Sequence, residues 1–245
     1  MTVAVISGAL LGALVGMLTN ELALLLPQSL LPAEDSPIAV ARRGPWDSFL
    51  EAVRSMPNRV RRRSVHGVAV RFPILEVGTA ALFGLMVMRF GVSWVLPAYL
   101  YLAGMAVLLA VIDVQHQRLP NFILLPSAAA ALILLTVAAL SRGSWDSLLR
   151  AVLGAVVLFV LYLVLALTSP GGMGMGDVKL AGVLGLFLGF LSWRVLILGT
   201  AGGFVLAALV GAALLAVRRV GKRTLLPFSP SMLLAALAAV LLRIG

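Results

Sequence analysis

The sequence predicts an all-α, polytopic integral membrane protein with about eight transmembrane helices. Of its 245 residues, 62% are hydrophobic and 11% are charged, and the mean hydropathy is +1.11. A chain with so little polar surface cannot cover a soluble domain. Its apolar residues also gather in runs, several of which reach the roughly 20 residues that a helix needs to cross a bilayer. These features together predict a membrane protein.

Eight apolar runs follow one another along the chain. They cover residues 3–26, 74–90, 92–112, 119–140, 148–167, 178–190, 195–217 and 225–242. The first run is too long for a cleavable signal peptide and no basic residue precedes it, so we expect residues 1–26 to form the first transmembrane helix. Its Gly8, Gly12 and Gly16 recur every four residues, which predicts that a second helix packs closely against it.

A polar segment, residues 27–71, separates the first run from the other seven. It contains several prolines and many arginines, and it is too short and too polar to hold a large core of its own. We therefore expect a basic cytosolic loop or a small subdomain here. Residues 72–245 are expected to form a membrane-embedded domain.

The basic residues predict the orientation, because Lys and Arg accumulate on the cytoplasmic side of membrane proteins. With the N-terminus outside, most of the 19 Lys and Arg residues fall on the cytoplasmic side, chiefly within residues 27–71. Topology and anionic lipid head groups then account for the net charge of +10. Membrane lipids are the expected partners of this charge, and nucleic acid is not.

Asp113 and Asp177 are the acidic residues, among nine in the chain, that we expect to carry chemistry. In the predicted topology Asp113 ends a run directed inward and Asp177 begins a run directed outward, so both lie at the cytoplasmic boundary. Ionisable groups near a bilayer are costly and tend to mark function. Two carboxylates that meet can share one proton and so provide an acid and a base. The sequence therefore predicts a catalytic pair.

Asp177 has a second interpretation, because an aspartate after a glycine-rich turn can simply cap the next helix. Capping does not explain the four glycines at residues 171, 172, 174 and 176. Glycine permits a left-handed conformation or a close approach of backbone, so we expect Gly174 and Gly176 to position Asp177 and to leave room for substrate. No metal site is expected, since the chain has no cysteine and only two histidines.

Two sequence blocks surround the aspartates. Residues 110–121 are AVIDVQHQRLPN, residues 172–180 are GMGMGDVKL, and two further segments are RFPILE at 71–76 and PFSP at 227–230. In this order, and within eight apolar runs, these blocks resemble those of the type IV prepilin peptidases, which are GxGD-type membrane aspartic peptidases.

The resemblance implies a role for each residue of the candidate site. Asp113 and Asp177 would be catalytic, one as a base that activates water and the other as an acid. Gly174, Gly176 and Lys179 would position the substrate. The peptidase reaction would need no cofactor and no metal.

The resemblance also implies a substrate and a location. The substrate would be a type IV prepilin or a type II secretion pseudopilin, cleaved between its basic leader and its apolar helix. The membrane would be a bacterial inner membrane, with the catalytic site facing the cytoplasm. The oligomeric state is not predicted by these features.

Many members of this family also methylate the new N-terminus, with S-adenosylmethionine as the methyl donor. Asn20 and Pro27 match residues of the family near the end of the first helix. The sequence departs from the family at Glu21, where an apolar residue is usual, and it lacks the four-cysteine cluster of many members. S-adenosylmethionine is therefore an expected cofactor only if the methyltransferase activity is retained.

Three alternatives remain open at this point. An ion-coupled transporter could use intramembrane acids as a proton path, although the sequence shows no paired broken helices in matching halves. A catalytically inactive scaffold in pilus or secretion assembly would not need both acids. A presenilin-like or preflagellin peptidase would share the GxGD motif and its catalytic use of aspartates but would differ in the other sequence segments.

Overall fold

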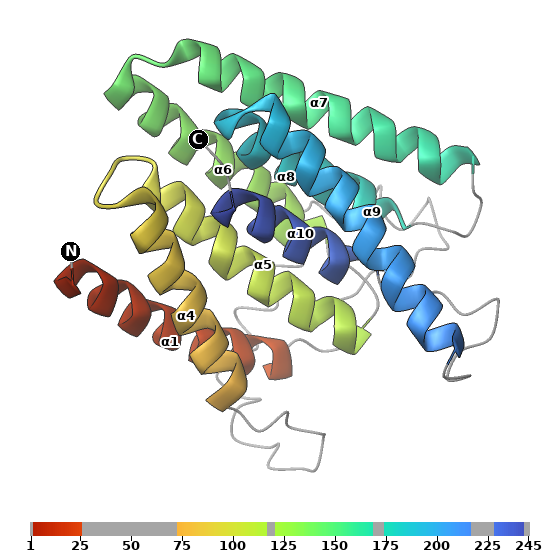
Figure 1. The fold of residues 1–245 in the computed structure, drawn as a ribbon, viewed down its shortest axis with the longest axis horizontal. Coiled ribbons are helices and arrows are strands. Elements are labelled where there is room, and N and C mark those ends of the chain that lie inside the picture. Colours follow the sequence, from red (N-terminus) through yellow and green to blue (C-terminus); the bar gives the residue numbers. More distant parts are fainter. Residues whose placement is uncertain (1, 26–72, 117–120, 169–173, 217–227, 243–245) are drawn as a thin grey trace, which may run out of the picture.

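The structure, a computed structural model, describes residues 2–25, 73–116, 121–168, 174–216 and 228–242. These residues form eight α-helices and no strand, which confirms the all-α prediction for the described part of the chain (Figure 1). The helices are α1 (Thr2–Leu25), α4 (Pro73–Phe90), α5 (Leu96–His116), α6 (Asn121–Arg142), α7 (Trp145–Thr168), α8 (Met175–Leu191), α9 (Trp193–Ala216) and α10 (Ser229–Leu241). The polar segment predicted at residues 27–71 lies outside the described residues, so its boundaries stay a prediction.

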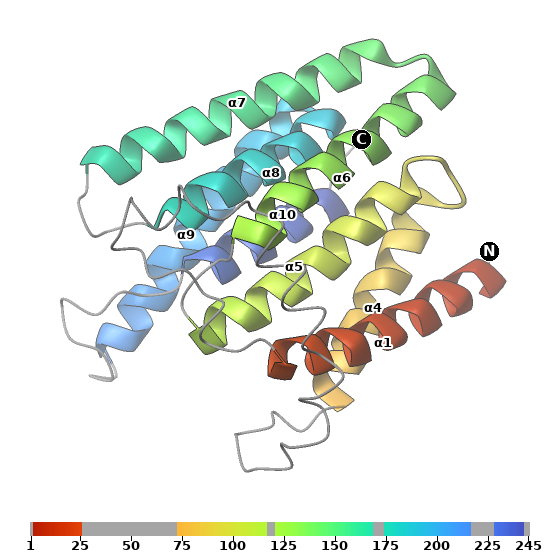
Figure 2. The same ribbon diagram turned by 180° about the vertical axis from the view of Figure 1, so that it is seen from behind.

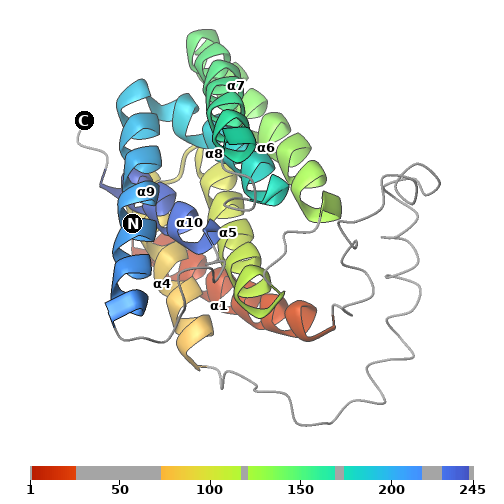
Figure 3. The same ribbon diagram turned by 90° about the vertical axis from the view of Figure 1, so that its right-hand side faces the viewer.

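Five of the described helices, α1, α5, α6, α7 and α9, are long and apolar enough to cross a membrane. They confirm the prediction of a polytopic membrane protein. The other three helices are shorter or less apolar, with 18 residues in α4, 17 in α8 and 13 in α10. In Figures 1 and 3, α10 lies inside the bundle, where it packs against α5, α8 and α9.

Tight turns make neighbouring helices antiparallel. At the end of α6, Gly143 adopts a left-handed conformation with φ +63°. Its N–H donates to the Leu140 carbonyl and the Ser144 N–H to the Ala139 carbonyl, which is the Schellman arrangement. Gly91, with φ +59°, follows the end of α4, and its N–H donates to the Val87 carbonyl at 2.8 Å. Successive helices alternate in direction, so the end of α5 and the starts of α8 and α10 lie at the same end of the bundle (Figures 1 and 2).

Helix α8 lies at the centre of the packing. Its residues from Val178 to Leu191 are almost all buried, and it contacts α5, α6, α7, α9 and α10. A helix that is apolar on every side is either enclosed by protein or exposed to lipid. The contacts of α8 with five other helices show that it is enclosed by protein.

Glycines bring the backbones of α7 and α8 into direct contact. A Cβ atom added at Gly185 would lie 2.5 Å from the Gly154 carbonyl oxygen and 2.6 Å from the Cα atom of Ala155. At Gly189 it would lie 2.7 Å from the Arg150 carbonyl oxygen. Small residues of this kind allow membrane helices to pack at short range.

The expected glycine stripe on the first helix is confirmed. A Cβ atom at Gly12 would lie 2.7 Å from the Thr79 carbonyl oxygen and 2.9 Å from the Cα atom of Ala80. At Gly8 it would lie 2.5 Å from a methyl group of Val87. The helix that packs closely against α1 is therefore α4.

Arg150 fixes the far end of α8. Its guanidinium, which is half-buried, donates from Nε to the Gly189 carbonyl at 2.8 Å and from Nη2 to the Phe190 carbonyl at 2.9 Å. The last carbonyls of a helix have no partner within the helix, and a cation there also complements the helix dipole. Arg150 thus anchors α8 to α7 at the end opposite Asp177.

Substitution of Gly185 tests the backbone contact between α7 and α8. We expect Gly185→Ala to destabilise the folded protein by about 1–3 kcal/mol, because the added methyl overlaps the backbone of α7. In a chain of this length that is a decrease of several degrees in Tm, at roughly 2–4 °C per kcal/mol. Thermal unfolding in detergent measures it.

Gly182→Ala is the matched control on the same helix. Its Cβ atom would lie 3.5 Å from the Phe159 side chain, which is an ordinary contact, so its Tm should stay close to that of the unmodified protein. Equal Tm values for Gly185→Ala and Gly182→Ala would contradict the proposed backbone contact.

Candidate active site

Asp113 closes the apolar part of α5, which covers Leu96–Asp113. The helix itself continues to His116, three residues beyond the end of the apolar run. The physical reason is that no glycine or proline separates Asp113 from His116. The carboxyl is buried, with 5% of the residue exposed. A buried carboxyl needs hydrogen-bond partners.

Ser229 provides one of these partners. It is the first residue of α10, it is fully buried, and its Oγ atom donates a hydrogen bond to Oδ2 of Asp113. Ser229 belongs to the segment PFSP at 227–230, and no role was predicted for it from the sequence. A serine before an apolar run usually predicts a helix cap. Here the N-cap residue is Phe228, and the hydroxyl of Ser229 reaches across to α5 instead.

Asp177 lies in the first turn of α8 and is half-buried. The N-cap of this helix is Gly174, in an extended conformation with φ −77° and ψ 149°, so the interpretation of Asp177 as the N-cap is wrong. Asp177 is the third residue of the helix. Its N–H donates to the Gly174 carbonyl at 3.0 Å. This bond between main-chain groups closes the first turn of α8.

The structure brings Asp113 and Asp177 together. The ends of α5 and α8 that carry them lie at the same end of the bundle (Figure 2), and the two helices contact each other. Their carboxyls are near enough to interact electrostatically. Two like charges at close range disfavour each other, so such a pair retains a proton more readily than either carboxyl would alone.

The remaining predicted site residues surround Asp177. Gly174 is exposed, and a Cβ atom there would meet nothing nearer than the Gly176 nitrogen at 3.9 Å. Gly176 lies in the first turn of α8. Among the described glycines only Gly91 and Gly143 have positive φ, so Gly174 and Gly176 are not there for a left-handed turn. Lys179 is half-buried two residues after Asp177 on α8.

Metal binding has no candidate residues in this part of the molecule. Within the ranges that the structure describes, no group of three or more His, Cys, Asp or Glu side chains could hold a metal ion. The chemistry open to the arrangement is acid and base catalysis by two carboxyls.

Comparison with known proteins identifies the family. The model of the type IV leader peptidase family matches residues 100–217. The prepilin leader peptidase/N-methyltransferase of Stutzerimonas stutzeri is 32% identical over 219 residues, which are 89% of this chain and 73% of that protein. The chain belongs to the type IV leader peptidase family. Asp113, Asp177 and the glycine turn all fall within residues 100–217, the region matched by the family model, whereas Ser229 lies beyond it.

Two further relatives carry the same name as the Stutzerimonas stutzeri protein. The Bacillus subtilis (strain 168) protein is 30% identical over 180 residues, which are 72% of this chain and 68% of that protein. The Pseudomonas putida protein is 34% identical over 179 residues, which are 71% of this chain and 59% of that protein. No solved structure matches the chain.

The hydrogen bond between Ser229 and Asp113 can be tested by a double-mutant cycle. Ser229→Ala removes a donor from a buried carboxyl and should destabilise the protein by about 1–3 kcal/mol. Combined with Asp113→Ala, its effect should shrink, giving a coupling of about 0.5–3 kcal/mol between the two sites. Unfolding in detergent, monitored by circular dichroism, measures the four proteins of the cycle.

The same cycle between Asp113 and Ser141 is the control. Ser141 lies near the C-terminal end of α6, at the end of the bundle remote from Asp113. Among the described residues its hydroxyl bonds only within its own helix, so the effect of Ser141→Ala on stability should add to that of Asp113→Ala. A cycle for Ser229 that is equally additive would show that the hydroxyl does not hold the carboxyl.

Proposed function

We propose that this chain is a membrane aspartic endopeptidase that removes the leader from type IV prepilins or type II secretion pseudopilins. The observation that supports the proposal is that Asp113 and Asp177 lie on helix ends at one end of the bundle, near enough to interact electrostatically. Of the two, Asp113 is buried and held by Ser229, while Asp177 stands beside an exposed glycine turn. The pair is thus anchored on one side and accessible on the other.

The two carboxyls divide the work of peptide hydrolysis. Because they share one proton, one of them acts as the base that takes a proton from the attacking water. The other donates its proton to the carbonyl oxygen, which gives a tetrahedral intermediate with two hydroxyl groups. When this intermediate collapses, the first carboxyl gives the proton that it took from water to the leaving amine, and the second carboxyl regains a proton from one of the hydroxyl groups. Water and the carboxyl pair complete this cycle, so the peptidase reaction requires no cofactor.

The turn before Asp177 gives the substrate access to the pair. A peptide bond within a helix must be unwound before its carbonyl can reach two carboxyls. Gly174 has no side chain, and no atom of the described residues lies nearer than 3.9 Å to its Cβ position, so an extended peptide can approach its backbone directly. We assign Gly174, Gly176 and Lys179 to the positioning of this peptide.

The orientation follows from the distribution of basic residues. If the first loop, residues 27–71, is cytoplasmic, the end of the bundle that carries the two aspartates faces the cytoplasm of a bacterial inner membrane. The basic leader of a prepilin lies on that side, and its apolar helix lies in the membrane. The scissile bond at their junction then comes to the depth of the carboxyl pair.

The relatives are named as N-methyltransferases as well as peptidases. Our proposal rests on the carboxyl pair and therefore covers the peptidase activity. A methyl transfer would require S-adenosylmethionine, and the conspicuous sequence departures from the family fall at Glu21 and within residues 27–71. Mass spectrometry of a processed pilin reports this second activity directly, because one methyl group adds to the mass of the new N-terminus.

Exchange of either aspartate is the direct test of the peptidase. Asp113→Asn and Asp177→Asn should each abolish leader cleavage when the chain is expressed with a candidate prepilin, because each removes one half of the acid and base pair. Both proteins should still accumulate in the membrane. The measurement is mass spectrometry of the pilin N-terminus.

Asp146→Asn is the matched control, since Asp146 is exposed in the first turn of α7 at the other end of the bundle. It should process prepilin at the normal rate. Normal processing by either active-site variant would exclude the proposed pair. Failure of the unmodified chain to process any prepilin would favour an inactive scaffold instead.

Gly174→Val tests substrate access. Valine adopts the extended conformation of Gly174 without strain, and no described atom is nearer than 3.9 Å to its Cβ position, so the fold should be unaffected. The side chain would nevertheless occupy the approach to Asp177. We expect at least a tenfold lower cleavage rate, about 1.4 kcal/mol in the barrier, with an unchanged Tm.

The control for this substitution is Gly78→Val on α4, where the glycine is exposed and nothing lies within 4 Å of the Cβ position. It should cleave prepilin normally. Equal rates for the two valine variants would remove Gly174 from the substrate path.

A further inference from the structure

The three tryptophans that the structure describes all lie at one end of the bundle. Trp94 lies in the turn before α5, Trp145 is the first residue of α7, and Trp193 is the first residue of α9. These turns join antiparallel helices at the end opposite Asp113 and Asp177, towards the left in Figure 1. The three side chains therefore mark one level of the bundle.

Each of these rings stands away from the core. The exposed fractions are 66% for Trp94, 58% for Trp145 and 43% for Trp193. Tryptophan is highly buried on average, so packing within the chain does not explain three exposed rings. A large apolar ring with one N–H donor suits a surface that is apolar on one side and wet on the other.

The apolar spans end at the same level. Two of them begin at Trp145 and Trp193, a third begins at Leu96, two residues after Trp94, and a fourth ends at Arg142. A level at which several membrane-spanning helices begin or end coincides with the boundary between hydrocarbon and head groups. Tryptophan is enriched at that boundary. The position and the residue type thus indicate the same partner, which is the layer of lipid head groups.

The charge at this level also fits head groups. Arg142 lies three residues before Trp145, Arg194 directly follows Trp193, and both arginines are exposed. In the described ranges, Asp146 is the one acidic residue of this end. Guanidinium groups bind phosphate oxygens through paired hydrogen bonds. The same face of a second copy of the chain would instead bring arginine against arginine.

We infer that Trp94, Trp145 and Trp193, together with Arg142 and Arg194, form a head-group anchor, a surface that binds phospholipid head groups at the membrane boundary remote from the two aspartates. The rings occupy the boundary, and the guanidiniums bind phosphate. The inference concerns how the bundle sits in the membrane, so it holds whatever reaction the carboxyls perform.

The head-group anchor is attached directly to α8. Ser192 alone separates Trp193 from Leu191, the last residue of α8. The Ser192 N–H donates to the Leu188 carbonyl at 3.2 Å, and the Val195 N–H donates to the Ser192 hydroxyl at 3.2 Å. The ring of Trp193 is therefore coupled closely to the end of α8.

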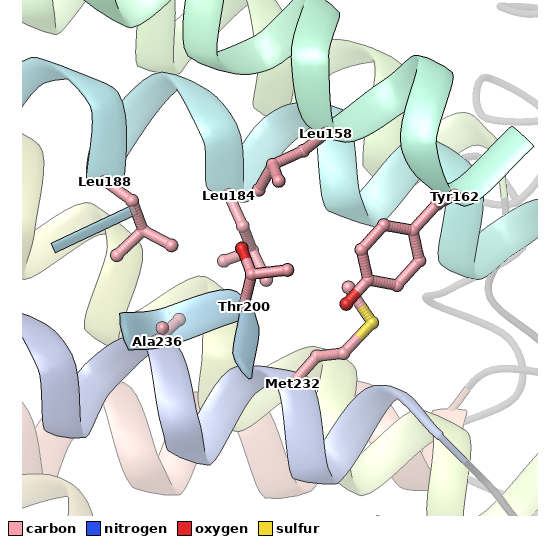
Figure 4. Close-up of a pocket in the computed structure, with 8 residues that line it drawn as sticks. Leu158, Tyr162, Leu184, Leu188, Thr200, Met232 and Ala236 are labelled. Carbon is pink, nitrogen blue, oxygen red and sulfur yellow. The ribbon is translucent and has the colours of Figure 1, made fainter. Parts of the chain in front are cut away.

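Close packing carries this position along the bundle. The cavity between α7, α8, α9 and α10 in Figure 4 has a volume of about 10 Å³, close to the minimum for one water molecule, so little free space separates these helices. Helix α8 has 17 residues, which is about 26 Å at roughly 1.5 Å per residue. The hydrocarbon core is about 30 Å thick. With the other end of α8 at the anchored boundary, Asp177 stays a few ångströms inside the opposite boundary.

Depth-dependent quenching of tryptophan fluorescence tests the head-group anchor. The full chain, with Trp46→Phe and only one of the three described tryptophans retained in each variant, is reconstituted into phosphatidylcholine vesicles. Lipids brominated near the head group should quench each ring about twofold or more strongly than lipids brominated near the end of the acyl chain. They should also quench it more strongly than iodide in the water.

Val157→Trp is the matched control, in a chain whose own tryptophans are all replaced by phenylalanine. Val157 is exposed near the middle of α7, so bromine near the end of the acyl chain should quench this ring most strongly. Quenching of Trp145 and Trp193 chiefly by iodide, or with the depth profile of Val157→Trp, would overturn the inference. Rings that neither lipid nor iodide quenches would show that a protein partner covers this end, and would overturn it as well.

The arginines are tested by a change of head group at a fixed bromine position. Brominated phosphatidylglycerol, which is anionic, should quench Trp145 and Trp193 more strongly than equally brominated phosphatidylcholine at the same fraction. The double variant Arg142→Gln and Arg194→Gln should lose this preference. Equal quenching by the two lipids when both arginines are present, or a preference that survives in the double variant, would overturn the assignment of phosphate binding to these arginines.

Discussion

The direct backbone contact between α7 and α8 is the constraint on which the site depends. Gly154, Gly185 and Gly189 allow the two helices to approach until their main chains meet, which fixes α8 along its own axis as well as sideways. Arg150 holds the last carbonyls of α8 from α7. A 17-residue helix secured in this way presents its first turn at one defined depth. Asp177 lies in that turn.

The second carboxyl is brought to the same place by contacts of a different kind. Tyr99 of α5 donates a hydrogen bond to the Phe187 carbonyl of α8, and Ser229 of α10 donates to Asp113. The helices that carry the two acids are therefore joined both directly and through α10. A buried carboxyl is costly unless it is hydrogen-bonded. For Asp113, the hydrogen bond from the Ser229 hydroxyl of α10 offsets part of that cost.

Much of this architecture could be predicted from the sequence. The apolar runs predict the helices, and the spacing of Gly8, Gly12 and Gly16 predicts that another helix packs closely against α1, although not which one. Alternation of direction predicts that Asp113 and Asp177 share one end. The partners of the carboxyls could not be predicted, because they come from distant segments. A serine before an apolar run has the pattern of a helix cap, so the sequence gives no sign that Ser229 bonds to Asp113.

The central claim is that Asp113 and Asp177 lie side by side, and the cysteine-free sequence allows a direct measurement. The double variant Asp113→Cys and Asp177→Cys would be treated in membranes with a short bifunctional thiol reagent, followed by proteolysis between the helices and mass spectrometry. The account predicts that the peptides of α5 and α8 stay joined, and that they separate in the pair Asp113→Cys and Asp146→Cys. Absence of the link between positions 113 and 177, with both thiols reactive towards a monofunctional reagent, would contradict it.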